Sequence, residues 1–108
     1  ITQQTLKTEK IASFFDEKYR YFCDLVNQYS ESMMNNSKEN FQYLAKLWKK
    51  RIKIHKEMRN TIKKIHADYR YDISQKYDEI SRKMHEKLMK FETMVLGGTA
   101  PSQGSTSA

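Results

Sequence analysis

Apolar residues recur at steps of three and four positions along the first third of the chain. This stripe consists of Ile11, Phe15, Phe22, Leu25 or Val26, Tyr29 and Met33. Such spacing places the side chains on one side of a helix, and it predicts a helix over about residues 5–34. Neither glycine nor proline occurs before Gly97, so the residues that most often end a helix are missing from this whole region.

A turn is predicted where this stripe stops. Asn35, Asn36 and Ser37 are poor helix formers, because their side chains readily bond to nearby backbone groups. Asn36 and Glu39 also have the spacing of a capping box, which marks the start of a helix. We therefore expect the chain to turn at 35–37 and a second helix to begin just after it.

The apolar positions of the second segment repeat every eleven residues from Leu44 to Val95. The three registers are Leu47, Met58, Tyr69, Ile80 and Phe91; Ile62, Ile73, Met84 and Val95; and Leu44, His55, His66, Tyr77 and Leu88. An eleven-residue repeat has about 3.67 residues per turn, so its seam runs almost straight along a helix. The repeat predicts one long helix over about residues 38–95.

These two predicted helices differ greatly in length. The second would be on the order of 85 Å long and the first about 45 Å, so the first could cover only half of the seam. An exposed apolar stripe favours aggregation unless another chain covers it. We therefore expect an all-α protein, an elongated helical hairpin or long helix that forms a coiled coil or bundle as a homo-oligomer or with a partner helix. The expected interface consists of Leu44, Leu47, Met58, Ile62, Tyr69, Ile73, Tyr77, Ile80, Met84, Leu88, Phe91 and Val95.

A compact three-helix bundle is the alternative fold. It requires a second turn near His66 to Asp68 and three arms of about thirty residues each. Such a bundle would bury the seam within one chain. However, no helix breaker occurs between Ile65 and Tyr71, and the eleven-residue register continues through this point. The pattern therefore favours the single long helix.

Positive charge is concentrated in the second segment. The chain carries a formal net charge of +7, and nine lysines and arginines between Lys46 and Lys64 face one acidic residue, Glu57. The lysines expected to bind anions are Lys46, Lys49, Lys50, Lys53, Lys56, Lys63 and Lys64. On a helical wheel most of these lysines lie opposite the apolar face, on which Phe41, Trp48 and Ile52 are expected to join the core.

A basic helical face of this kind fits several anionic partners. Nucleic acid phosphates, anionic lipid headgroups and an acidic protein surface such as that of calmodulin all offer the required charge. With nucleic acid we expect contacts to the backbone without base readout, because lysine dominates the cluster. With a membrane we expect electrostatic binding alone, because the seam already occupies the apolar side of the helix.

No residue set in the chain forms a recognisable catalytic or metal site. The histidines His55, His66 and His85 lie too far apart in sequence to bind a metal from one helix face. We therefore expect no enzymatic activity, cofactor, metal or small-molecule substrate. The single cysteine, Cys23, favours a reducing compartment and an intracellular location in the cytoplasm or nucleus. Residues 97–108 are predicted to form a flexible tail, because they are rich in glycine and serine.

Taken together, the sequence predicts a non-enzymatic assembly protein. It would oligomerise through the helical seam and present the basic face to an anionic partner. The alternative is a helical module whose main role is to bind nucleic acid or an anionic membrane.

Overall fold

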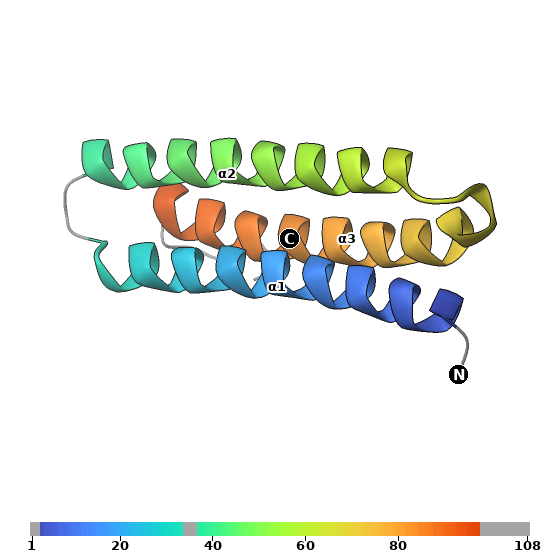
Figure 1. Ribbon diagram of the computed structural model, residues 1–108. Coiled ribbons are helices and arrows are strands. Elements are labelled where there is room, and N and C mark those ends of the chain that lie inside the picture. The colour runs from blue at the N-terminus through green and yellow to red at the C-terminus, as the bar shows by residue number, and fades with distance from the viewer. Residues whose placement is uncertain (1–2, 34–36, 98–108) are drawn as a thin grey trace, which may run out of the picture.

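The computed structural model describes residues 3–33 and 37–97, and within these ranges it contains helices and no strand (Figure 1). The elements are α1 (Gln3–Glu31), α2 (Ser37–Lys64), the short 3-10 helix η1 (Ala67–Tyr69) and α3 (Arg70–Leu96). The predicted all-α class is therefore confirmed. Residues 35 and 36 of the turn predicted at 35–37 lie outside the described residues, as do residue 34 and residues 98–108 of the predicted tail, whereas Ser37 begins α2.

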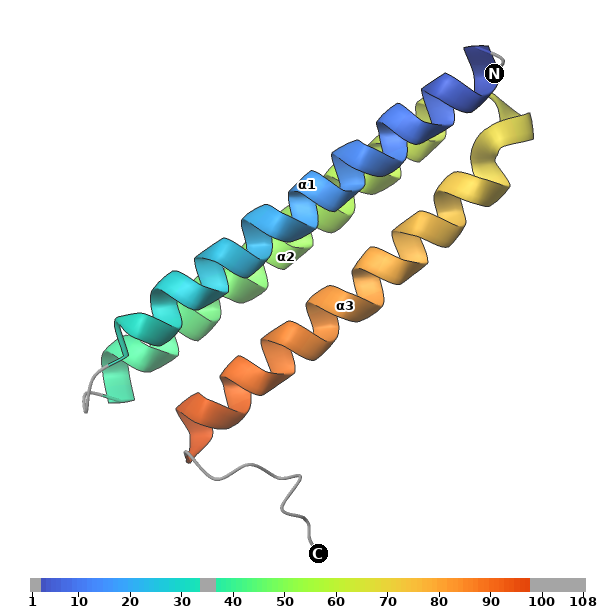
Figure 2. The same ribbon diagram turned by 90° about the horizontal axis from the view of Figure 1, so that it is seen from below.

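The three helices lie side by side, with α1 and α3 running in one direction and α2 in the other (Figures 1 and 2). Between α1 and α2, the rings of Tyr29 and Tyr43 stack with their centroids 4.7 Å apart. Between α1 and α3, Lys76 Nζ lies 2.8 Å from an Asp16 carboxylate oxygen. Side chains from both members thus fix the register of α1 against α2 and of α1 against α3.

One apolar core runs between the three helices. It consists of Phe15, Phe22, Val26, Leu44, Leu47, Ile54, Met58, Ile73, Ile80, Met84, Leu88 and Phe91. The predicted stripe of the first helix is confirmed, because Phe15, Phe22 and Val26 are buried and the remaining members pack against this core. Burial of each large apolar side chain stabilises the fold by about 1.5–3 kcal/mol, so the core accounts for the association of the helices.

The single helix expected over about residues 38–95 is wrong, because α2 ends at Lys64 and α3 begins at Arg70. Polar groups rather than glycine or proline form this turn. His66 has an extended backbone (φ −62°, ψ 143°), and its Nδ1 accepts a hydrogen bond of 3.2 Å from the backbone N–H of Asp68. The side chain of His66 therefore caps the short helix that follows.

Arg70 completes the turn from its other side. Its guanidinium donates hydrogen bonds to the backbone carbonyls of Ile65 at 3.3 Å and Lys63 at 3.4 Å. These carbonyls lie at the end of α2, where no further helical N–H can reach them. The second turn thus occurs where the three-helix alternative required it.

Because of this turn, most residues of the expected oligomer interface lie in the chain's own core. Of its residues, Leu44, Leu47, Met58, Ile73, Ile80, Met84, Leu88 and Phe91 are buried within the chain, and Ile62, Tyr69, Tyr77 and Val95 are half-buried. The premise that the second half of the seam lacks cover is wrong, because α3 folds back and packs against both other helices. The chain itself buries most of the stripe that was expected to require a second chain.

Candidate anion-binding surface

The predicted basic face lies along α2. All seven lysines expected to bind anions belong to this helix, and only Lys50 among them is half-buried, whereas the other six are exposed. Within the described ranges, no helix has an apolar stretch long enough to cross a membrane. The basic face is therefore exposed along most of α2.

Four of these lysines surround a shallow hollow beside α1. Lys46, Lys49, Lys50 and Lys53 occupy positions that fall on one side of a helix, and with Leu25 and Tyr29 of α1 they line a hollow of about 290 Å³. We call these four residues the lysine cradle. The amine of Lys50 also lies 5.0 Å from the centre of the Tyr21 ring, which is a cation–π contact.

The carboxylates of the described residues leave the positive charge of the cradle unpaired. Glu57, the one acidic residue among these basic positions, forms an ion pair of 2.9 Å with Lys18 of α1. Within the described residues, none of the four cradle lysines forms an ion pair with a carboxylate. Neighbouring like charges on a helix repel one another, so an anion bound in the cradle would relieve this repulsion.

A second surface of α2 is apolar and exposed. Phe41, Trp48 and Ile52 expose 47%, 36% and 62% of their surfaces, so the prediction that they join the core is wrong. The buried position at the centre of α2 is Leu47, and the three residues lie about 100–140° around the helix from it. We call these three residues the apolar strip. A helical wheel with Leu47 at the centre of the buried side would have predicted that this strip is exposed.

Basic side chains accompany the apolar strip on the side that faces α3. The guanidinium of Arg51 lies 5.3 Å from the centre of the Trp48 ring. Another hollow of about 290 Å³ is lined by Trp48, Arg51, Ile52, His55 and Arg59. Arg59 also donates a hydrogen bond of 3.3 Å to the hydroxyl of Tyr77 on α3. Apolar and cationic groups therefore alternate along this side of α2.

His55 connects this side of α2 to α3. Its Nδ1 lies 2.9 Å from the Tyr77 hydroxyl, and its Nε2 lies 3.5 Å from the Ser81 hydroxyl. Burial, followed by the positive charges of Arg51 and Arg59, lowers the pKa of His55 below its ordinary value of 6.5. The imidazole is therefore neutral at pH 7, and its role is to join the two helices.

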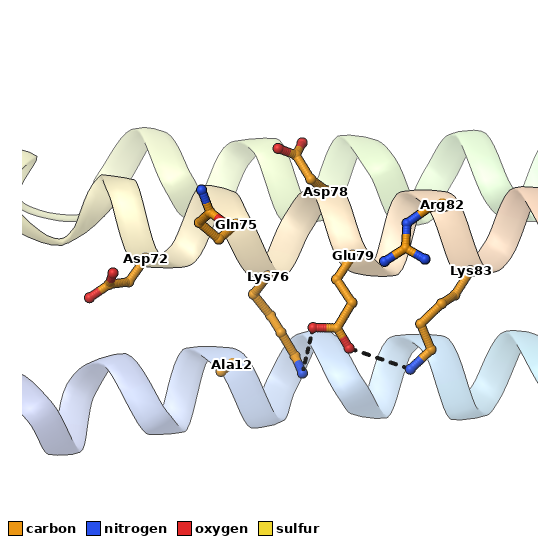
Figure 3. Close-up of a pocket in the computed structure, with 8 residues that line it drawn as sticks. All are labelled: Ala12, Asp72, Gln75, Lys76, Asp78, Glu79, Arg82 and Lys83. Carbon is orange, nitrogen blue, oxygen red and sulfur yellow. Dashed lines mark hydrogen bonds and ion pairs between the residues drawn. The ribbon is translucent and has the colours of Figure 1, made fainter.

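A larger hollow, of about 660 Å³, lies between α1 and α3 (Figure 3). It is lined by Ala12, Asp72, Gln75, Lys76, Asp78, Glu79, Arg82 and Lys83. Its charges largely neutralise one another, because Glu79 lies 3.5 Å from both Lys76 and Lys83. A hydrogen bond to Asp16 raises the pKa of Lys76, which keeps this amine charged. The ion pair between Lys76 and Asp16 therefore joins α3 to α1 beside this hollow, and the hollow has no clear charge preference for a ligand.

The outer side of α2 is thus cationic along the cradle and apolar along the strip. The two surfaces lie on opposite sides of Leu47 on the same helix, and within the described residues the strip and all cradle lysines except Lys50 are exposed. No family model, no curated protein and no solved structure matches this chain.

Proposed function

We propose that this chain is a non-enzymatic helical module that binds anionic membrane surfaces through the outer side of α2. The observation that carries the proposal is the exposed apolar strip on the same helix as exposed lysines that form no ion pair within the described residues. Peripheral binding to a membrane typically combines apolar contact with the interface and attraction to anionic lipids. Both requirements are met on one helix.

The lysines supply the electrostatic part of this binding. A lysine or arginine close to an anionic leaflet contributes about 1 kcal/mol, and the contribution falls off over about 8 Å at physiological salt. Exposed lysines extend along α2 from Lys46 to Lys64. Several of them can therefore approach one membrane plane together when α2 lies parallel to it.

The apolar strip supplies the second part. Tryptophan favours the membrane interface, where its ring contacts lipid and its indole N–H stays near polar groups. Phe41 and Ile52 already expose about half of their surfaces to water, and each exposed methylene buried in lipid contributes about 0.8 kcal/mol. Three such side chains give weak apolar binding, so the lysines are needed as well.

A membrane accounts for more of this surface than nucleic acid does. Phosphates of a DNA or RNA backbone would engage the lysines, but they would leave Phe41, Trp48 and Ile52 in water. From the sequence we expected only electrostatic binding to a membrane, because the residues of the strip were expected in the core. Its exposure removes that objection.

Self-association fits this surface less well. Pairing through the eleven-residue seam would require the helices to separate, since most of the seam is buried in the chain's own core. A symmetric pair formed through the apolar strip would bring Arg51 and Arg59 of one copy towards their counterparts in the other. Like charges facing each other oppose such a pair.

Vesicle co-sedimentation tests the proposal. We expect the chain to bind vesicles made of phosphatidylserine and phosphatidylcholine. It should not bind vesicles made only of phosphatidylcholine. The variant Phe41→Ser/Ile52→Ser should bind about tenfold more weakly, because two partly exposed apolar side chains no longer enter the interface. Tyr71→Ser, which removes an exposed aromatic from α3, is the matched control and should bind like the unchanged chain.

Two results would contradict the proposal. The first is equal binding of the strip variant and the unchanged chain, which would mean that the strip does not contact lipid. The second is binding to a short DNA duplex that prevents binding to anionic vesicles and is unaffected in the strip variant. That result would assign the lysines to nucleic acid instead.

A further inference from the structure

We propose that the lysine cradle is a specific site for a group that carries clustered phosphates, of the inositol polyphosphate class. Such a group can reach the cradle as a lipid headgroup or as a free molecule. If the ligand is a lipid headgroup, this inference rests on the proposed membrane binding and names the lipid class that is recognised. The site itself is argued from the arrangement of Lys46, Lys49, Lys50 and Lys53 around their hollow.

The spacing of the four lysines concentrates charge in a small volume. Positions separated by three, four and seven residues lie on one side of a helix within two turns, and all four lysines line a single hollow. A volume of about 290 Å³ lies at the lower end of the range for small-molecule sites. It suits a headgroup-sized ligand with several negative charges better than an extended one.

Contacts with α1 hold parts of this site in place. Tyr29, which lines the hollow, is stacked on Tyr43 with an interplanar angle of 9° and a centroid distance of 4.7 Å. Lys50 is positioned by its contact with the Tyr21 ring at 5.0 Å. Side chains that are ordered before binding lose less conformational entropy when the ligand arrives.

The charge of the cradle distinguishes it from the other large hollow. No acidic side chain lines the cradle, whereas Asp72, Asp78 and Glu79 line the hollow between α1 and α3. The nearest acidic residue along α2, Glu57, is paired with Lys18. Phosphate groups carry up to two negative charges each at neutral pH, so a clustered set matches four amines that pair with no carboxylate in the described part of the chain.

Isothermal titration of the full chain with inositol hexakisphosphate tests the site. The cradle variant is Lys49→Gln/Lys53→Gln, and the matched control is Lys56→Gln/Lys63→Gln, which removes the same charge from exposed positions outside the cradle. We expect the dissociation constant to rise about tenfold or more in the cradle variant, because two charge-assisted contacts to phosphate are lost. In the control it should rise less than about threefold, which reflects long-range attraction alone.

Vesicle binding then identifies the source of the ligand. Vesicles containing phosphatidylinositol bisphosphate are compared with phosphatidylserine vesicles of the same total charge. A preference for the first that disappears only in the cradle variant supports a lipid headgroup. Selective binding of inositol hexakisphosphate without this lipid preference supports a free ligand.

Three results would overturn the inference. They are no binding of inositol hexakisphosphate, equal loss of binding in the cradle and control variants, and tighter binding of a short DNA duplex with the same selective loss. The membrane proposal fails separately. If phosphatidylserine vesicles do not bind while inositol hexakisphosphate binds selectively, the cradle stands and the membrane proposal is contradicted.

Discussion

Single residues determine which part of the amphipathic pattern becomes core and which becomes surface. Phe22 and Phe41 both belong to apolar stripes, but Phe22 is fully buried, whereas Phe41 exposes 47% of its surface. The sequence placed both in the core, because hydrophobicity alone does not identify the side of a helix that its neighbours cover. The difference has a direct energetic consequence.

Truncation of these two phenylalanines should affect stability very differently. Phe22→Ala removes a fully buried ring, and we expect it to lower the free energy of unfolding by about 3–5 kcal/mol. Phe41→Ala should lower it by less than about 1 kcal/mol. Urea denaturation followed by circular dichroism measures both. Similar losses in the two variants would show that Phe41 is part of the core.

His55 makes the stability of the fold depend on pH. Its pKa is lowered in the folded state, so the unfolded chain takes up a proton first as pH falls below the ordinary value of 6.5. The free energy of unfolding attributable to this group should therefore decrease as pH falls from about 7.5 to about 5. Arg51 and Arg59 on α2 contribute by repelling the imidazolium, while Tyr77 and Ser81 on α3 are its hydrogen-bond partners.

Thermal unfolding across this pH range tests the role of His55. In His55→Gln the decrease towards low pH should be smaller, because glutamine does not titrate. The matched control is His85→Gln, which changes an exposed histidine of α3 and should leave the decrease intact. An identical pH dependence in His55→Gln and the unchanged chain would contradict the assignment.

At the scale of elements, the sequence predicted α1 and the apolar positions of α3 but failed at the connection between α2 and α3. The eleven-residue repeat correctly selects Ile73, Ile80 and Met84 as buried positions. It cannot detect a turn that preserves the repeat on both sides. The turn depends on side-chain hydrogen bonds from His66 and Arg70, and these residue types are common within helices.

A distance measurement distinguishes the folded-back arrangement from one long helix. In a continuous helix, positions 46 and 90 would lie about 66 Å apart. Because α2 and α3 are antiparallel neighbours, spin labels at Lys46→Cys and Lys90→Cys should instead lie less than about 30 Å apart. The labels are placed in a Cys23→Ser background and measured by electron paramagnetic resonance. A distance near the longer value would contradict the turn.

At the scale of the whole molecule, folding separates the apolar residues into a core and an exposed strip. The basic cluster could be predicted from the charge pattern, because residues 46–64 contain nine lysines and arginines and a single acidic residue. The hollow of the cradle could not, because Leu25 and Tyr29 come from another helix. The apolar strip was also missed, because its exposure depends on where α1 and α3 pack around α2.

Trp48 provides the most direct test of the central claim that the outer side of α2 binds anionic membranes. It is the single tryptophan of the chain and lies within the apolar strip, so its fluorescence reports on this surface alone. On addition of phosphatidylserine and phosphatidylcholine vesicles, we predict a blue shift of its emission and quenching by brominated lipid. Vesicles of phosphatidylcholine alone should produce neither change. Emission that stays unchanged at saturating anionic vesicles would contradict the claim.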